Sequence, residues 1–562
     1  MKTRTDVVVW LAGAGMGIWV VSATVGAGQP NRGGLDSGVI PRPVSVEVTV
    51  GRFEVNRRTR VVAEDRSRTE ASRLVEDLAT PMGWRLPLSD EMGHAENRIW
   101  LRIDSAAEGR LGTEGYELEV TPRGVDITAA GPAGLFYGGL TLRQLMPPEV
   151  FGRRLVEAVN WVVPSVRIVD YPRFQWRGLL IDPARHFIPV VDVERFIDVM
   201  AMHKLNRLQM HLTDNEGWRI QIRKYPKLTE LGSTMDWSLR RDRTSPSRCF
   251  GFYSQQEIRS LVRYAADRHI TIVPEIEMPY HTGAAIVAYP ELGLNADVLA
   301  KLPPEQRWDK AHGLIAPRPQ TVAFFHDVLT EVIELFPSPW IHIGGDEANI
   351  GLWAADPQMQ AQMKDLGLAD AHALHSWFIT QMDAFLTERG RRLVGWDEIL
   401  QGGLAPGATV MSWRGTAGGI AAARASHDVV MAPTSHTYFD YRQATGETGL
   451  GGSVIDLARV YSFEPIPDEL GVEQAGYILG GQGQLWGELI ADRRRREFMA
   501  FPRGSALSEV LWSPRAGRDF QQFSVRLARH LDRLRLADVN YRPPDGAAVD
   551  GDRPQAARTE PR

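Results

Sequence analysis

The sequence predicts an α/β protein in which a (β/α)8 TIM barrel follows a small α+β domain. The chain has 562 residues. This length exceeds one typical domain of about 100–200 residues, but it fits a small domain joined to a barrel of roughly 250 residues or more. After Tyr171 and Pro172 the chain alternates between short apolar runs and amphipathic stretches, and eight such runs can be counted. Eight alternating β and α units are the signature of a TIM barrel.

The first 27 residues differ from the rest of the chain. Lys2 and Arg4 precede an apolar run at residues 7–21, and small residues follow it. We expect residues 1–27 to be a signal peptide, residues 28–38 a flexible lead-in, and the mature protein to be exported, periplasmic or secreted. The alternative is an uncleaved anchor, if the small residues extend the run toward the ~20 that cross a bilayer. No other segment has such a run, so no span is expected in the mature protein.

The second predicted unit is a non-catalytic α+β domain at residues 39–172. Residues 46–50, 117–120 and 124–129 have the pattern of strands, and residues 70–78 and 133–145 that of helices. No part of this unit concentrates nucleophiles, metal ligands or paired acids. A packing role is therefore expected, because function has to be argued from a site.

The catalytic barrel is predicted at residues 173–540, and the Pro- and Arg-rich tail at residues 541–562 is expected to be disordered. The eight expected strands are residues 176–181, 207–212, 270–276, 340–344, 391–395, 408–412, 428–432 and 477–481. The clearest helices between and after them are predicted at residues 193–203, 255–268, 321–336, 371–388, 418–426 and 495–512. A long insertion in the second unit and a long loop after residue 433 in the seventh are expected over the active face.

Acids and tryptophans recur just past the predicted strands. In chain order the strand-end residues are Asp182, Arg185, His211, Asp214, Glu277, His281, Asp346, Glu347, Trp396, Asp397, Glu398, Trp413, Tyr438, Asp440, Trp486 and Glu488. Such a ring suits a sugar, whose C–H faces stack on aromatic rings while its hydroxyls bond to charged groups. The adjacent acids Asp346 and Glu347 follow two glycines, and different surroundings would keep one ionised and the other protonated. His203 and His211 are interpreted as structural.

Several other classes are excluded or disfavoured. With 64 Lys and Arg against 69 Asp and Glu, no basic face for nucleic acid is implied. A single cysteine excludes a disulfide framework and multi-cysteine metal sites. Two rivals remain open: a metal hydrolase using His281, His342 and Asp346, which lacks closely spaced histidine pairs, and a sugar-binding protein that has lost catalysis. We expect no metal and no cofactor.

Six motifs, in order and at barrel spacing over about residues 173–515, make the chain resemble the family 20 glycoside hydrolases, the β-N-acetylhexosaminidases. They are Arg177-Gly-Leu-Leu-Ile-Asp-Pro-Ala-Arg-His-Phe187, Asn206-Arg-Leu-Gln-Met-His-Leu-Thr-Asp-Asn-Glu-Gly-Trp218, Pro274-Glu-Ile-Glu-Met-Pro-Tyr-His281, His342-Ile-Gly-Gly-Asp-Glu347, Gly395-Trp-Asp-Glu398 and Leu485-Trp-Gly-Glu488. The domain before them is similar to the family's usual non-catalytic N-terminal domain. The resemblance implies an exo-acting retaining enzyme for terminal β-linked GlcNAc or GalNAc, and a carbohydrate as the partner.

The resemblance also implies roles. Glu347 would be the acid and then the base, Asp346 would orient the substrate acetamido group, Tyr438 would bond to the acetamido oxygen, and Asp214 with His281 would form a relay to Glu347. The implied substrate-binding residues are Arg185, Trp396, Trp413, Asp440, Trp486 and Glu488. One departure is Asp214-Asn215, where many relatives have two aspartates.

Adjacency of the two acids bears on the mechanism. A pair of acids suits the common retaining scheme, in which an enzyme carboxylate attacks the sugar. Neighbouring side chains on an extended chain point in opposite directions, however. We therefore expect Asp346 and Glu347 to diverge and the substrate's own 2-acetamido group to attack, through an oxazolinium intermediate, as the resemblance implies.

Overall fold

The computed structural model describes residues 38–90, 96–234, 250–447, 449 and 451–544. The expected signal segment and all of the lead-in except residue 38 lie outside the described residues, as do residues 545–562 of the expected tail. Within the described part of the chain, no helix is both long enough and apolar enough to cross a membrane.

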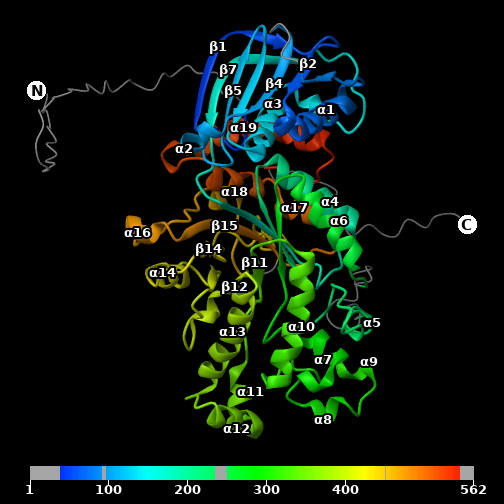
Figure 1. Cartoon of the computed structure of the whole chain (residues 1–562), viewed down its shortest axis with the longest axis vertical. Helices are drawn as coiled ribbons and strands as arrows, with labels where there is room; N and C mark the ends of the chain where they lie inside the picture. The colour runs from blue at the N-terminus through cyan, green and yellow to red at the C-terminus, as the bar shows by residue number, and fades with distance from the viewer. Residues whose placement is uncertain (1–37, 91–95, 235–249, 448, 450, 545–562) are drawn as a thin grey trace, which may run out of the picture. The chain divides into compact units, whose positions relative to one another are not determined.

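The small domain is built on a seven-stranded mixed sheet with the order β1-β7-β5-β6-β4-β2-β3 (Figure 1). Its strands are β1 (Ser45–Glu54), β2 (Arg60–Ala63), β3 (Leu88–Ser89), β4 (Arg98–Ile103), β5 (Tyr116–Thr121), β6 (Gly124–Ala129) and β7 (Val162–Asp170). Along β5, Tyr116, Leu118 and Val120 are buried and alternate with more exposed residues, as a half-buried strand requires. Helices α1 (Arg68–Met82) and α3 (Pro132–Leu145) pack against the sheet, and α2 (Glu108–Leu111) is a single turn.

Eight parallel strands close into the predicted barrel, in the order β10-β11-β12-β13-β14-β15-β8-β9. They are β8 (Trp176–Ile181), β9 (Arg207–His211), β10 (Thr271–Glu275), β11 (Trp340–His342), β12 (Arg392–Trp396), β13 (Thr409–Ser412), β14 (Val429–Met431) and β15 (Ile478–Leu485). All six residues of β8 are buried. Strands covered on both faces read as continuous apolar runs, which is why the sequence locates all eight.

The helices that cover the barrel fall largely where the sequence predicts them. The longer ones are α4 (Val190–Met202), α6 (Gln255–Ala266), α10 (Pro319–Leu335), α12 (Pro357–Asp365), α13 (Ala371–Glu388), α14 (Ala417–Arg424), α17 (Arg493–Ala500), α18 (Arg503–Trp512) and α19 (Phe520–Leu536). The short ones are α5 (Lys227–Glu230), α7 (Gly283–Ala288), α8 (Ala296–Leu299), α9 (Pro304–Arg307), α11 (Ile350–Ala355), α15 (Leu457–Tyr461) and α16 (Val472–Ala475). The single helix predicted at residues 495–512 is wrong: it divides into α17 and α18 at Pro502, which has no N–H to continue a helix.

Buried ion pairs join the small domain to the barrel near the N-terminal ends of the barrel strands. Arg177, near the start of β8, bonds to Glu114 at 2.7 Å. Lys204, just before β9, bonds to Asp170 at 2.8 Å, and neither of these two side chains is exposed. These contacts do not involve the C-terminal ends of the barrel strands, where the active sites of TIM barrels lie.

Candidate active site

A pocket of about 220 Å³ opens at the C-terminal ends of the barrel strands. Every catalytic and substrate-binding residue that the resemblance implies lines it, whereas the strand-end acids Asp182, Asp397 and Glu398 do not. None of the lining residues comes from the small domain. The lining residues are Arg185, His211, Asp214, Glu277, His281, Asp346, Glu347, Trp396, Trp413, Tyr438, Asp440, Tyr441, Gly451, Trp486 and Glu488. Loops after different strands contribute them, as in other TIM-barrel sites.

The Gly344-Gly345 pair shapes the backbone that carries the two adjacent acids. Gly344 has φ +71°, and a Cβ placed there would lie 1.6 Å from Glu277 Oε2. The absent side chain thus makes room for the Glu277 carboxyl group, and only glycine takes this conformation without strain. Glu347 itself has φ 52°, a left-handed conformation that is uncommon outside glycine and is found where function requires it.

The predicted divergence of Asp346 and Glu347 is wrong. Asp346 Oδ2 lies 3.6 Å and Glu347 Oε2 3.3 Å from the same atom, His281 Nε2. The extended backbone that the prediction assumed does not occur here, because the left-handed turn at Glu347 brings its side chain back toward that of Asp346. The two carboxylates still differ in environment, since the Asp346 side chain is 12% exposed and that of Glu347 53%.

Asp214 and His281 form a line of contacts that ends at Glu347. His281 Nδ1 lies 3.0 Å from Asp214 Oδ1, while the other carboxylate oxygen of Asp214 lies 2.7 Å from both Arg185 Nη2 and His211 Nε2. Burial raises the pKa of Asp214, but the charges of Arg185 and His281 and the histidine hydrogen bonds outweigh burial and hold this pKa well below its usual range. Asp214 is therefore a firmly ionised carboxylate.

The surroundings of His281 favour its protonated form. Burial lowers the pKa of His281, but the charge of Asp214 and hydrogen bonds with Asp214, Asp346 and Glu347 raise it well above its usual value. The hydrogen bond from His281 is the main cause that lowers the pKa of Glu347. For Glu347 this direction favours the ionised form while substrate is absent, with the imidazole as the proton donor. The expectation that one of the two adjacent acids is protonated stays a prediction. Asn215, the departure noted in the sequence, accepts from the Gly283 N–H and leaves the Asp214–His281 contact intact.

Aromatic side chains form the walls of the pocket. The Trp396 and Trp486 rings have centroids 5.8 Å apart, and Trp413 stacks with Tyr438 at 6.2 Å. The Trp413 indole N–H donates to Glu398 Oε2 at 2.9 Å, which fixes the plane of the ring. Burial, followed by the charge of Asp440, raises the pKa of Tyr438 well above its usual value. Tyr438 thus keeps its O–H as a donor.

Acidic groups and one guanidinium occupy another side of the pocket. Asp440 Oδ1 and Glu488 Oε2 are buried and have no hydrogen-bond partner within the described part of the chain. Burial raises the pKa of both groups. Arg185 donates to Asp182 and Glu216, each at 3.2 Å, in addition to Asp214, and its guanidinium carbon lies 5.2 Å from the Trp486 ring centre. Buried oxygens without partners are suited to ligand hydroxyls.

Sequence reasoning missed several residues of the site. His211, which the sequence led us to interpret as structural, lines the pocket and contacts Asp214. Tyr441, which lines the pocket, was not singled out. Two acids that bond to lining residues were also missed: Glu216, which bonds to Arg185, and Glu275, which bonds to His211 and Trp396. One signal was present in the sequence: Glu275 and Glu277 are two residues apart at the end of a strand, so both side chains lie on the same side of it.

Known proteins resemble both domains. Residues 174–515 match the family "Glycosyl hydrolase family 20, catalytic domain", and residues 36–171 match "Glycosyl hydrolase family 20, domain 2". A Beta-hexosaminidase of Porphyromonas gingivalis is 41% identical over 90% of this chain, which spans 64% of the length of that relative. A Beta-N-acetylhexosaminidase of Cellulomonas fimi is 32% identical over 88% of this chain and 94% of its own length.

Solved structures agree with these matches. The GH20 exo β-N-acetylglucosaminidase of Vibrio harveyi in complex with N-acetylglucosamine superposes with a TM-score of 0.80, at 31% identity over 91% of this chain and 79% of the other. The GH20 β-N-acetylhexosaminidase of Streptomyces coelicolor gives a TM-score of 0.79, at 32% identity over 92% and 99% of the two chains. The chain therefore belongs to glycosyl hydrolase family 20, and it is a glycoside hydrolase related to the β-hexosaminidases.

Proposed function

We propose that this protein is an exo-acting, retaining β-N-acetylhexosaminidase, which removes terminal non-reducing β-linked GlcNAc or GalNAc by substrate-assisted catalysis. The observation that carries the proposal is the convergence of Asp346, Glu347 and His281 in a pocket that also holds the Tyr438 hydroxyl. The pocket volume of about 220 Å³ is below the roughly 300–1,000 Å³ of drug-sized ligand sites. It therefore suits one sugar unit at a chain end.

In the first step, the acetamido oxygen of the substrate forms a bond to the anomeric carbon. The bond from that carbon to the leaving oxygen breaks, and Glu347 supplies the proton that the leaving oxygen takes up. The product of this step is an oxazolinium ring. In the second step water attacks the same carbon, Glu347 accepts a proton from the water, and the ring opens to restore the acetamido group. Two inversions retain the β configuration.

His281 supplies the proton that the acid needs. Its Nε2 lies 3.3 Å from Glu347 Oε2 and its Nδ1 faces the Asp214 carboxylate. Because interactions with the neighbouring carboxylates raise the pKa of His281, the proton persists above the usual histidine range and is lost as the pH rises further. The pair of His281 and Glu347 thus acts as one titrating unit, and activity should fall when that unit loses its proton.

Asp346 and Tyr438 act on the acetamido group. Asp346 would accept a hydrogen bond from the acetamido N–H and stabilise the positive charge that develops on the oxazolinium ring. Its Oδ1 is buried and has no hydrogen-bond partner among the described residues, so this atom remains for the ligand. The Tyr438 hydroxyl, kept neutral by burial, which raises its pKa, would donate to the acetamido oxygen and align it for attack.

The remaining pocket residues would hold the sugar ring. The indoles of Trp396, Trp413 and Trp486 enclose its apolar faces. The unpartnered oxygens of Asp440 and Glu488 would bond to ring hydroxyls. Because the pKa of each of these acids is raised, either one can also donate a proton in such a bond.

The test uses defined chito-oligosaccharides, with the products analysed over time by mass and the anomer of the first product followed by NMR. We expect single GlcNAc units released from the non-reducing end as the β anomer. Internal cleavage would contradict the exo action, and a first-formed α anomer would contradict retention. Undiminished activity after prolonged incubation with EDTA is expected, and its loss would favour the metal-dependent alternative.

We also propose that the protein is exported after removal of residues 1–27, and that the small domain takes no part in the chemistry. The motif order in the sequence and the absence of small-domain residues from the pocket lining support the second statement for the described residues.

A further inference from the structure

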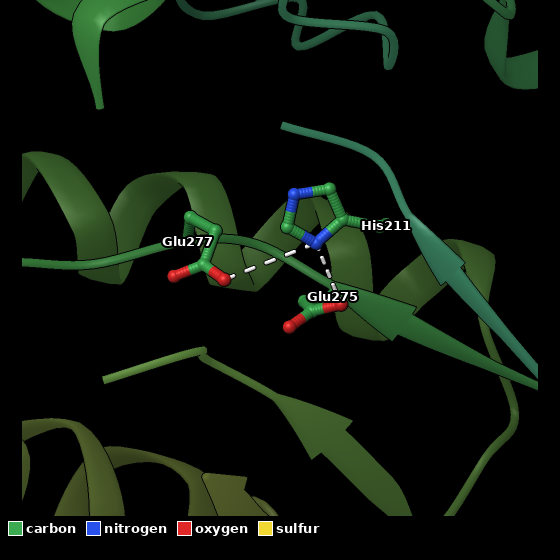
Figure 2. A group of neighbouring side chains, drawn as sticks. All are labelled: His211, Glu275 and Glu277. Carbon is green, nitrogen blue, oxygen red and sulfur yellow. Dashed lines mark hydrogen bonds and ion pairs between the residues drawn. The ribbon is translucent and has the colours of Figure 1, made fainter. Parts of the chain in front are cut away.

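His211 and Glu275 form a buried pair directly behind the line from Asp214 to Glu347. Figure 2 shows the His211 ring with the same nitrogen, Nδ1, directed toward the carboxylates of both Glu275 and Glu277. His211 Nδ1 lies 2.8 Å from Glu275 Oε2, and His211 Nε2 lies 2.7 Å from Asp214 Oδ2. Both side chains of the pair are at most 1% exposed.

Together these contacts form one hydrogen-bonded chain of side chains, in which carboxylates and imidazoles alternate. Its members, in order, are Glu275, His211, Asp214, His281 and Glu347. The four successive nitrogen–oxygen distances are 2.8, 2.7, 3.0 and 3.3 Å. It leads from a fully buried residue of β10 to the half-exposed side chain of the proposed acid and base. Charge at the buried end is therefore coupled to Glu347 through polar contacts at every step.

The geometry favours a proton on each ring nitrogen of His211, because each nitrogen faces a carboxylate oxygen at hydrogen-bond distance. Burial lowers the pKa of His211, but the charge of Glu275 and hydrogen bonds with Asp214 and Glu275 raise it to about 10. His211, Glu275 and Glu277 are close enough together to surround an ion. A doubly protonated imidazole has no free lone pair, however, so this donor set does not suit a metal.

Glu275 ties this chain to the wall of the pocket. Its Oε1 accepts from the Trp396 indole N–H at 3.0 Å, and its Oε2 accepts from Gln209 Nε2 at 2.8 Å as well as from His211. Burial raises the pKa of Glu275, but the charges of His342 and His211 and the bonds they donate hold it well below its usual range. A single ionised carboxylate thus fixes both an aromatic wall and His211.

We propose that the relay to Glu347 extends two residues deeper than Asp214: His211 holds Asp214 oriented toward His281, and Glu275 holds His211 and Trp396. His211 and Glu275 are positioning residues, since neither one touches the reacting atoms. This inference rests on the proposed function, because it assigns the two residues an effect on the proton that Glu347 transfers.

The sign of that effect follows from the charges around His211. Within the described residues, the charged or titratable groups that contact His211 or act on its pKa are Asp182, Arg185, Asp214, Glu275 and Glu277, and Glu216 bonds to Arg185 behind them. Arg185 donates to the same oxygen of Asp214 as His211 does, so Asp214 keeps one cationic partner when His211 is replaced. Removing the positive charge of His211 leaves the relay more negative, and this raises the pKa of the unit formed by His281 and Glu347. Removing the charge of Glu275 does the opposite.

The experiment measures kcat/KM against pH for the variants H211Q, E275Q and the double variant, with 4-nitrophenyl N-acetyl-β-glucosaminide as the substrate. The basic limb of the profile is the pH range in which kcat/KM falls as the pH rises. We expect its midpoint to rise by about 0.5–1 pH unit in H211Q and to fall by a similar amount in E275Q. In the double variant the two changes in charge cancel, and the limb should return to near its wild-type position. A merely structural role predicts lower rates without opposite shifts.

The control is H203Q. His203 is buried outside the pocket, contacts Val199 and Ser505, and has a pKa that burial lowers to about 4. Its replacement changes no charge at neutral pH, and the limb should not move. If the active wild type gives single variants that shift in the same direction or not at all, the inference is wrong while the proposed function stands. An inactive wild type would instead refute the proposed function.

A second measurement observes the protonation of His211 in the wild-type protein. In wild-type protein labelled with ¹⁵N-histidine, the imidazoles of His211 and His281 should both keep their two ring protons above about pH 8, because the pKa of each is raised. The resonance of His211 is assigned by its absence from the double variant, or by its contacts with the Trp486 ring, whose centroid lies 5.0 Å away. A neutral His211 at that pH would overturn the inference.

Discussion

Replacement of Asp214 by Asn should disable the proton supply to Glu347 while keeping the shape of the side chain. Asp214 accepts hydrogen bonds on both oxygens: from Arg185 and His211 on Oδ2, and from His281 and the Asn215 backbone N–H on Oδ1. Asn has one acceptor oxygen and one donor amide. Both donors to Oδ2 are cationic, whereas Oδ1 has one cationic donor and one backbone N–H, so we expect the Asn oxygen to stay with Arg185 and His211 and the amide group to face His281 Nδ1.

The size of the effect follows from what this does to His281. Nδ1 must then accept, so the imidazole becomes neutral and keeps its only proton on Nε2. Asp214 also supplies the largest of the charge effects that raise the pKa of His281. Without that charge this pKa falls, and the relay loses its proton at a lower pH. General acid catalysis contributes about 10²–10⁴-fold, and we expect a loss of kcat/KM of about 10²–10³-fold near neutral pH, smaller in acid.

The assay records kcat/KM between about pH 4 and 9 for chitobiose and for 4-nitrophenyl N-acetyl-β-glucosaminide. The loss should be greater for chitobiose, whose leaving group needs more protonation. D383N is the matched control, because Asp383 is a buried acid of α13 that accepts from the Gly407 N–H outside the pocket. A wild-type pH profile in D214N, with chitobiose turnover within a few-fold of wild type, would refute this account of the relay.

Three further predictions concern the acid, the glycine turn and the N-terminus. E347Q should lose about 10²–10⁴-fold in kcat/KM on chitobiose but less in the first step with a 4-nitrophenyl leaving group, and near-normal chitobiose turnover would reject Glu347 as the acid. G344A should lower the free energy of unfolding by about 2–4 kcal/mol in denaturant titrations, since the new Cβ strains a left-handed residue and displaces the Glu277 carboxyl group; an unchanged midpoint would contradict that reading. The intact mass of exported protein should place its first residue near Gly28, and a retained Met1 would contradict cleavage.

The barrel was predictable because its strands are covered on both faces. Such strands appear as continuous apolar runs, and the loops after them begin with the polar residues that reach the pocket. The chain order alone then places Arg185, Asp214, Glu347, Tyr438 and the other site residues at one end of the barrel. The helical periodicity, by contrast, continues across residue 501 and concealed the break at Pro502.

What the sequence could not supply was conformation at single residues and contacts between distant ones. Nothing in the sequence Asp346-Glu347 indicates a φ of 52° at Glu347, yet this one angle turns two diverging side chains into two that share His281. A histidine within an apolar run reads in the same way whether it fills space or carries charge. The role of His211 depends on Glu275, which lies 64 residues later in the chain.

The central claim is that the substrate, and not an enzyme carboxylate, attacks the anomeric carbon. The most direct measurement compares kcat for 4-nitrophenyl N-acetyl-β-glucosaminide with kcat for the matched 4-nitrophenyl β-glucoside, which has a 2-hydroxyl in place of the acetamido group. The glucoside has no acetamido oxygen to attack with and leaves Asp346 and Tyr438 without partners in the transition state, so its defect should lie mainly in kcat. We predict a loss of several orders of magnitude in kcat on the glucoside, and comparable kcat values on the two substrates would mean that a carboxylate of the enzyme is the nucleophile.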